Sequence, residues 1–262
     1  MRRLRHLTSQ RRTLGTNQLL GALLAFNAGA VNAGGFLVVG LYTSHMTGFA
    51  SMLADQLVLG NMALALGALG ALLAFVSGAV ATALMVNWAR QHRLRSEYAL
   101  PLMLEALLLL VFGLMGATMG HQTPFAVPLT VLVLAFTMGL QNALVTKISA
   151  AQIRTTHMTG VITDLGIELG KLIYWNRQNK STDADLESAP VAVRANRFKL
   201  RLYGILLLSF FCGGIVGALG FKHVGFIWVL PLATLLMLAS LPPLLTDLRK
   251  GLRSIAIKTI HR

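Results

Sequence analysis

Six residues of this chain occur twice. Thr-Ser-His-Met-Thr-Gly at 43–48 returns as Thr-Thr-His-Met-Thr-Gly at 155–160, and each copy follows a long apolar run. The similarity continues upstream, where one set of residues has identical counterparts 110 positions later: Ala25, Phe26, Gly29, Asn32 and Ala33 return as Ala135, Phe136, Gly139, Asn142 and Ala143. The pattern predicts two copies of one structural unit, one over about 19–119 and one over about 125–245.

The charged residues are clustered and leave long stretches free of charge. The chain is 55% hydrophobic and 12% charged, whereas soluble domains carry about 25% charged residues. A run of about 18 or more apolar residues is typical of a transmembrane helix. The sequence therefore predicts an all-α integral membrane domain over 19–245, with six helices at Leu19–Tyr42, Met62–Trp88, Leu100–Met119, Phe125–Val145, Leu202–Phe221 and Gly225–Leu245.

Three helices per copy is an odd number, so the second copy has to enter the membrane from the opposite side. This is an inverted-topology repeat, an arrangement that many secondary transporters share. The second helices of the two copies also align, with Gly78 and Gly213 at matching positions inside small-residue patterns that allow helices to pack closely.

The formal net charge of +14 follows the membrane topology. If the tail 1–18 is cytoplasmic, then the loop 176–201 and the tail 246–262 are cytoplasmic too, and Lys222 is the one Lys or Arg outside. Basic cytoplasmic segments are the positive-inside pattern, and they attract anionic lipids. We therefore expect membrane lipids as partners, both termini on the cytoplasmic side, and no nucleic acid.

The motifs of the second copy resemble the YoaK family, also known as domain of unknown function 1275. The resemblance is carried by Met-Gly-Leu-Gln-Asn-Ala at 138–143, the hexapeptide at 155–160 and Thr-Asp-Leu-Gly at 163–166, and it covers roughly 20–245. The first copy departs from the family pattern, since Asn32-Ala33 stands where Asp-Ala is common and Phe49 where Asn is common. The resemblance implies a multi-pass protein of the bacterial inner membrane, and it brings no activity.

The hexapeptides are the first candidate for a binding site. Thr47 and Thr159 are predicted helix N-caps, and the residues that follow, Gly48 and Gly160, begin amphipathic helices. Free N–H groups at such helix starts favour anions and can point at a substrate. The alternative is that each hexapeptide begins an ordinary interfacial helix, and that the similarity reflects duplication alone.

Polar side chains within the apolar spans are the second candidate. Asn32, Gln141 and Asn142 are costly to expose to lipid, so we expect them to face protein or water. Asn32 and Asn142 are equivalent and can form a symmetric polar pair that either lines a solute path or holds helices together. Four further residues are candidates for proton coupling, because they titrate or lie in a span: His45, His157, Glu105 and Asp164.

These patterns favour a transporter of a small solute or ion that binds between the two repeats, with a homodimer as a plausible assembly. The alternative is a membrane scaffold that binds lipids or proteins through its basic cytoplasmic face. A membrane enzyme is a third interpretation, although the sequence holds no Walker A loop, His-Glu-x-x-His or nucleophile elbow. We expect no cofactor, and no metal site, since the His residues lack a second ligand at helical spacing.

Overall fold

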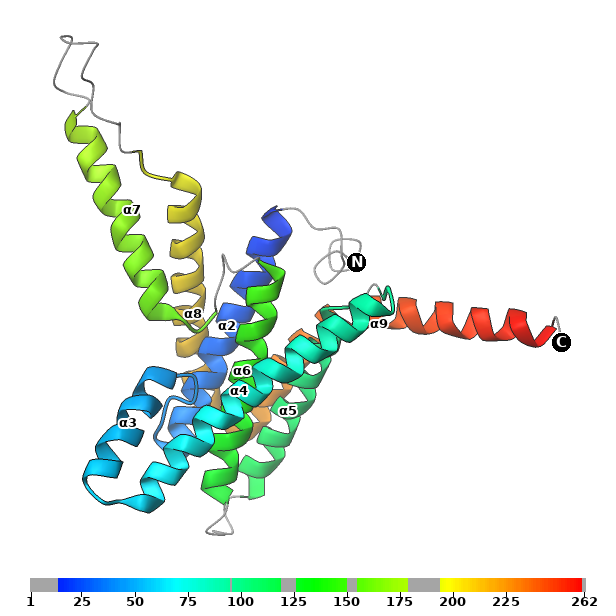
Figure 1. Ribbon diagram of the computed structural model, residues 1–262, viewed down its shortest axis with the longest axis horizontal. Helices are drawn as coiled ribbons and strands as arrows, with labels where there is room; N and C mark the ends of the chain where they lie inside the picture. Colours follow the sequence, from blue (N-terminus) through cyan, green and yellow to red (C-terminus); the bar gives the residue numbers. More distant parts are fainter. Residues whose placement is uncertain (1–13, 95, 119–125, 150–154, 179–193, 261–262) are drawn as a thin grey trace.

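The computed structural model describes residues 14–94, 96–118, 126–149, 155–178 and 194–260. Regular structure within these ranges is helical (Figure 1). The helices are α2 (Leu14–Val39), α3 (Met46–Val58), α4 (Met62–Gln91), α5 (Ala99–Thr118), α6 (Ala126–Ile148), α7 (Met158–Gln178), α8 (Arg197–His223), a short 3-10 helix η1 (Gly225–Trp228) and α9 (Val229–Ile260).

Six of these helices are long and apolar enough to cross a membrane, counting only the described residues. They lie at Asn17–Val39, Met62–Gln91, Ala99–Gly116, Pro128–Ile148, Arg197–His223 and Gly225–Arg249. The six predicted spans are therefore confirmed, with shifts of a few residues at their ends. The helices α3 and α7, which follow the two hexapeptides, are not among the six, and α3 with 13 residues is about 20 Å long, short of a bilayer core of about 30 Å.

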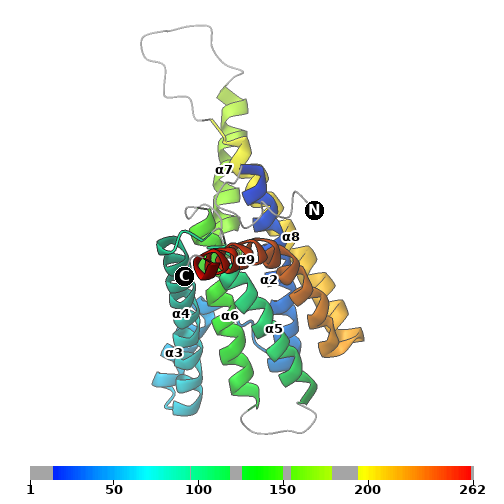
Figure 2. The same ribbon diagram turned by 90° about the vertical axis from the view of Figure 1, so that its right-hand side faces the viewer.

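Helices from the two halves of the chain pack against each other in a crossed pattern. The most extensive contacts join α2 to α8 and α4 to α6, and α5 lies along α9. The chain runs downward through α2, α5 and α8 in Figure 1 and upward through α4, α6 and α9, and the turned view in Figure 2 agrees. The first helix of each half thus packs on the second helix of the other half, and its counterpart runs in the opposite direction.

Four glycines allow the two crossings to be this close. A Cβ atom placed on Gly29 would lie 2.1 Å from the carbonyl oxygen of Phe210 on the facing helix, which is far inside van der Waals contact. The equivalent glycine of the second half, Gly139, meets the carbonyl oxygen of Phe75 at 2.0 Å in the same way. The facing helices repeat the pattern, with Gly213 against the oxygen of Phe26 at 2.0 Å and Gly78 against that of Phe136 at 2.1 Å. The sequence prediction that Gly78 and Gly213 serve close packing is confirmed.

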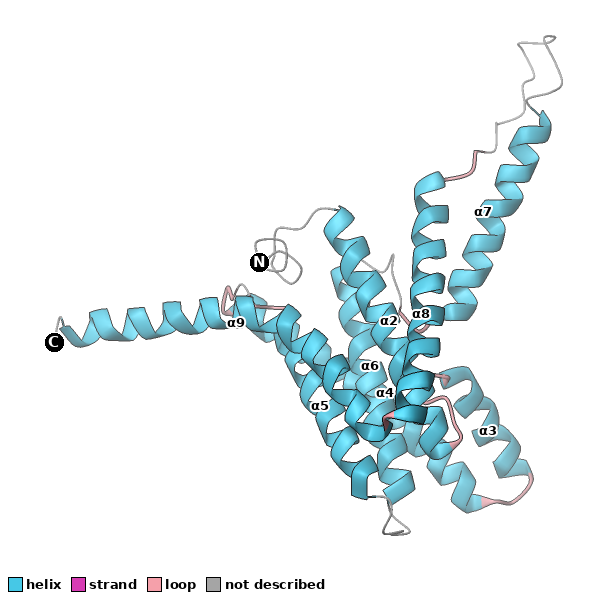
Figure 3. Cartoon of the chain, turned by 180° about the vertical axis from the view of Figure 1, so that it is seen from behind, coloured by secondary structure: helices cyan, strands magenta, loops and turns pink. Residues whose placement is uncertain are grey.

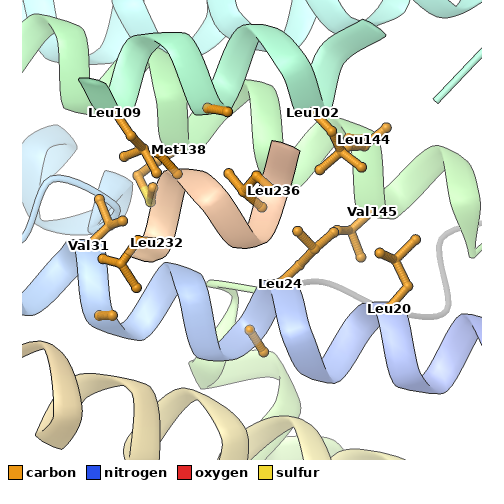
Figure 4. Packing of buried hydrophobic residues seen from close by; sticks show 14 of the residues in the cluster. Leu20, Leu24, Val31, Leu102, Leu109, Met138, Leu144, Val145, Leu232 and Leu236 are labelled. Atoms are coloured by element: carbon orange, nitrogen blue, oxygen red, sulfur yellow. The ribbon is translucent and has the colours of Figure 1, made fainter. Parts of the chain in front are cut away.

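The first helix of each half presents the same surface to its neighbours. Residues 21–30 and 131–140 follow the same order of buried and partly exposed positions. Their buried side chains meet those of α5 and α9 in one apolar core, which Figure 4 shows from close by with Leu24, Val31 and Met138 labelled. The helices α7 and α8 extend together beyond this core (Figure 1).

The last helix continues beyond the predicted end of the membrane domain at residue 245. Helix α9 extends to Ile260 and contains Pro242 and Pro243. Proline lacks an N–H donor and its ring clashes with the preceding turn, so a helix bends there. Figure 3 shows the final part of α9 leaving the bundle at an angle, so residues 246–260 form part of a helix that the sequence analysis had treated as a separate tail.

Candidate functional site

The loop after α2 folds back along that helix. The side-chain oxygen of Asn32 accepts hydrogen bonds from the backbone N–H of Ser44 at 3.4 Å and from its hydroxyl at 3.0 Å. Asn32 precedes the last residue of α2 by seven positions, which is about 10 Å of helix. Gly40 makes the reversal possible, because its φ of 69° is a left-handed conformation that glycine adopts without strain. The hexapeptide therefore lies about 10 Å inside the end of α2.

The loop after α6 repeats this arrangement. The side-chain oxygen of Asn142 accepts from the backbone N–H of Thr156 at 3.3 Å, and its amide nitrogen donates to the Thr156 hydroxyl and to the carbonyl oxygen of Met138. Asn142 lies six residues before the end of α6 at Ile148, so this loop returns by about 9 Å. Asn32 and Asn142 are thus equivalent anchors, each for the loop of its own half, and their side-chain hydrogen bonds in the described residues form no symmetric pair.

The predicted N-caps are wrong. Helix α3 begins at Met46 with His45 as its N-cap, and α7 begins at Met158, so Thr47 and Thr159 lie inside the first turn. The reason is the anchoring of Ser44 and Thr156, which positions the backbone so that the carbonyls of His45 and His157 accept the first helical bonds, from Phe49 and Val161. The sequence showed the cap chemistry of threonine but not this tertiary hydrogen bond.

Each histidine ring lies over the glycine three residues further on. A Cβ atom on Gly48 would come within 2.5 Å of His45 Nδ1, and one on Gly160 within 2.4 Å of His157 Nε2. Both histidines and both threonines, Thr47 and Thr159, are exposed. The His45 side chain makes no capping hydrogen bond, so the first N–H groups of α3 receive no side-chain cap and can accept a ligand.

Two threonines that the sequence analysis did not single out lie beneath these histidines in the chain. Thr43 and Thr155 are the first residues of the two hexapeptides, and both side chains are completely buried. Neither hydroxyl has a hydrogen-bond partner within the described ranges, which is costly for a buried polar group. Their position in the repeat was the signal available in the sequence, since the repeat matches at all but one of its six positions.

A second group of polar side chains lies between the two loops. Glu105 is completely buried and accepts a hydrogen bond from the side-chain nitrogen of Asn27 at 3.2 Å. Gln141 donates to the backbone oxygen of Leu24 at 3.0 Å, one turn before Asn27 in α2. Gln141 is therefore level with Leu24, and its neighbour Asn142 lies about 12 Å from Asn32 along α2. The two loops thus meet α2 on either side of Asn27 and Glu105.

The last proton-coupling candidate is distant from this group. Asp164 is exposed on α7 and lies beside Tyr203 of α8. One turn along α7, Glu168 accepts from the backbone N–H of Asn196 at 2.7 Å and from Lys171 at 2.9 Å. These two contacts, the backbone hydrogen bond first, hold the pKa of Glu168 below its usual value. This part of α7 therefore stabilises the start of α8, while His45, His157, Glu105 and Asp164 do not form one cluster.

The residues that the structure describes contain no group of three or more His, Cys, Asp or Glu side chains arranged to hold a metal ion. Cys212 is exposed on α8. What the site offers chemically is therefore hydrogen bonding: two folded-back loops with buried hydroxyls and uncapped N–H groups, and a buried carboxyl with two amides between them.

Comparison with known proteins agrees with this description of a membrane protein. The family model described as "Protein of unknown function (DUF1275)" matches residues 20–241. The chain is 28% identical over 166 residues to the UPF0700 transmembrane protein YoaK of Bacillus subtilis (strain 168), an alignment that covers 63% of this chain and 72% of that protein. No solved structure matches. The resemblance found in the motifs is confirmed.

Proposed function

Since the chain belongs to the DUF1275 family, whose description names no activity, we propose a function from its own residues: it transports a small solute or ion that binds between two inverted repeats. The proposed site lies between the folded-back loops, with Asn32, Asn142, Gly48 and Gly160 at its edges. The protein resides in the bacterial inner membrane with both termini on the cytoplasmic side. Transport of this kind requires no covalent step and no cofactor.

The opposite directions of equivalent helices support the inverted repeat. Gly29 meets Phe210 as Gly139 meets Phe75, and Asn32 holds Ser44 as Asn142 holds Thr156. Two equivalent sets of contacts between chain segments that run in opposite directions are expected of a pseudo-twofold axis in the membrane plane. With three crossings per half, that axis is also what the distribution of Lys and Arg requires.

The observation that carries the transport proposal is the return of both loops to the depth of the bundle. Non-helical backbone within a membrane is tolerated only where protein or a water-filled cavity satisfies its polar groups. Thr43 and Thr155 place a buried hydroxyl without a partner in each returning loop. Half-helices that begin inside the bilayer and point their N–H groups inward form the substrate sites of several transporter folds.

The second candidate function is a scaffold that binds anionic lipids or acidic proteins. It is favoured by four exposed cations at the start of α8, namely Arg194, Arg197, Lys199 and Arg201, because a basic cytoplasmic surface binds anionic headgroups. Neutral replacement of these four residues abolishes function under this alternative, whereas Asn32→Ala leaves it unchanged. The transport proposal makes the opposite expectation. A homodimer stays a prediction.

Topology is tested with single cysteines in a Cys212→Ala background. A membrane-impermeant maleimide is expected to label His45→Cys from the outside and His157→Cys from the cytoplasm, in right-side-out and inverted vesicles respectively. Lys222→Cys and Arg194→Cys serve as controls for the two sides. Labelling of positions 45 and 157 from the same side contradicts the inverted repeat.

Transport is tested with proteoliposomes on a solid-supported membrane, where concentration jumps of chloride, phosphate, sodium, acetate and alanine are applied. We expect a current above that of protein-free liposomes for at least one of these probes, with loss of that current in Asn32→Ala and Asn142→Ala. Gly67→Ala is the control, since nothing lies within 4 Å of a Cβ atom at that position. Currents that match protein-free liposomes for every probe contradict the proposal.

A further inference from the structure

We propose that Asn27, Glu105 and Gln141 form a binding site for one small monovalent cation, either a proton or Na⁺, at the centre of the helix bundle. Binding of the cation stands on its own evidence. Its role as the ion that drives transport rests on the function proposed above.

The three side chains meet because each occupies the middle of an inward-facing stripe. Asn27 follows Leu24 by three residues and precedes Val31 by four, which places all three on one face of α2. Glu105 has the same spacing in α5, and Gln141 has it in α6. The six flanking residues belong to one apolar core, and Figure 4 shows them turned toward each other: Leu24, Val31, Leu102, Leu109, Met138 and Val145.

Two hydrogen bonds place the polar atoms close together. The side-chain nitrogen of Asn27 lies 3.2 Å from Glu105 Oε1, which joins α2 to α5. Gln141 Nε2 lies 3.0 Å from the backbone oxygen of Leu24, which joins α6 to the same turn of α2. A carbonyl oxygen in a helix points along the axis toward the next turn, so the amide of Gln141 lies beside the side chain of Asn27.

The atoms left over are all oxygens. Asn27 Oδ1, Glu105 Oε2 and Gln141 Oε1 are buried and have no hydrogen-bond partner among the described residues, and all three side chains are completely inaccessible. An unpaired buried oxygen costs free energy, and these three lack a donor or a positive charge. A proton on Glu105 supplies a donor, and Na⁺ supplies a charge that amide and carboxylate oxygens coordinate.

No described side chain of the elements packed against α5 supplies that charge. Within the described ranges, α2 and η1 contain no charged residue. Arg90 of α4 pairs with Glu97 at 2.9 Å, and Lys147 of α6 lies 3.4 Å from Asn87 near the end of its helix. On α9, Asp247 accepts from the backbone of Ser96 and Arg249 is exposed. A carboxylate at this depth is costly without compensation, so the positive charge comes from a bound cation.

The site occurs once per chain. The positions equivalent to Asn27, Glu105 and Gln141 in the other half hold Thr137, Leu235 and Val31, which supply a single hydroxyl, and Thr137 donates it to the carbonyl of Val133 in its own helix. A purely structural polar contact would serve either half equally well. Its confinement to one half predicts a stoichiometry of one cation per chain.

The decisive variant is Glu105→Gln, which keeps the shape and hydrogen-bonding capacity of the side chain and removes its charge. Purified protein is melted with Na⁺ or with choline at equal ionic strength, and separately across about pH 5.5 to 9. If the cation is Na⁺, it raises the wild-type melting temperature by about 3 °C or more, and Glu105→Gln does not respond. If the cation is a proton, Na⁺ has no effect and the wild-type melting temperature falls as the pH rises, while that of Glu105→Gln stays level.

Glu168→Gln, the same change outside the spans, is the control and responds like the wild type over this pH range. Glu105→Asp is a second variant that retains the charge, so it keeps the response even if Glu105→Gln folds poorly. Responses to Na⁺ and to pH that are the same in wild type and Glu105→Gln overturn the cation site. A cation response without any solute current contradicts the transport proposal alone, and a current without a cation response contradicts the cation site alone.

Discussion

The two halves of the membrane domain are alike where helices cross and differ where polar groups are buried. Gly29 and Gly139 meet equivalent carbonyl oxygens at 2.1 and 2.0 Å, and Asn32 and Asn142 anchor equivalent loops. In contrast, Asn27 and Glu105 of the first half correspond to Thr137 and Leu235 of the second. The comparison separates the scaffold, which needs both copies, from the buried chemistry, which needs one.

The physical reason lies in what each feature requires of its neighbours. A crossing at backbone contact tolerates no side chain on either helix, so both copies retain their glycines. A buried carboxyl is costly to accommodate, and a second one nearby would repel the first. We therefore expect substitutions in the scaffold to act similarly in both halves and substitutions in the buried group to act in one.

The largest expected effect comes from the crossings. Gly29→Ala and Gly139→Ala each force a methyl group onto a facing carbonyl oxygen, and because backbone cannot move aside as a side chain can, each loses at least about 3 kcal/mol, the upper end for overpacking. Monodispersity and melting temperature in detergent measure the loss. Gly67→Ala and Gly204→Ala, where a Cβ meets open space, remain at or above wild-type stability. Tolerance of alanine in one half only would break the comparison.

Loss of the loop anchors comes next. Asn32→Ala and Asn142→Ala leave buried partners unsatisfied and cost about 1–3 kcal/mol locally, seen as faster hydrogen exchange in residues 40–48 or 155–162. The effect is larger for Asn142, which also donates to Met138. Exchange that accelerates in the opposite half would show that the loops are coupled and not independently anchored.

A smaller effect is expected beneath the histidine rings. Gly48→Ala and Gly160→Ala displace His45 and His157, which are exposed and can turn away at a cost of about 0.5–1.5 kcal/mol. The double variants His45→Ala/Gly48→Ala and His157→Ala/Gly160→Ala remove the clash and recover the melting temperature. Gly166→Ala, with nothing within 4 Å of its Cβ, is the matched control, and a double variant as unstable as the single one refutes the packing.

The smallest effect concerns the junction of α7 and α8, which the first half lacks, since Gln56 stands at the position equivalent to Glu168. Hydrogen bonds from Asn196 and Lys171 hold the pKa of Glu168 below its usual value. A lowered folded-state pKa contributes stability at neutral pH that is lost as the pH falls through that value. The difference in melting temperature between wild type and Glu168→Gln should therefore shrink on acidification, and a difference that grows instead contradicts this assignment.

Much of the architecture followed from patterns that are local along the chain. The six apolar runs predicted six helices because each run satisfies its own backbone hydrogen bonds, and the repeated Gly and Asn residues marked the crossings and the anchors. The N-cap prediction at Thr47 and Thr159 was wrong because a hydrogen bond from a distant Asn side chain set where each helix begins. Thr43 and Thr155 were missed for the same reason, since burial of a hydroxyl depends on what surrounds it.

The sequence by itself determined a six-helix membrane protein built from two similar halves, because hydrophobic length and internal similarity are properties of the chain alone. Only the tertiary structure decided that α2 packs on α8 and α4 on α6, and that Asn27, Glu105 and Gln141 share one core. Those residues lie on three helices far apart in sequence, and their meeting depends on how the helices rotate against one another, which no single helix specifies.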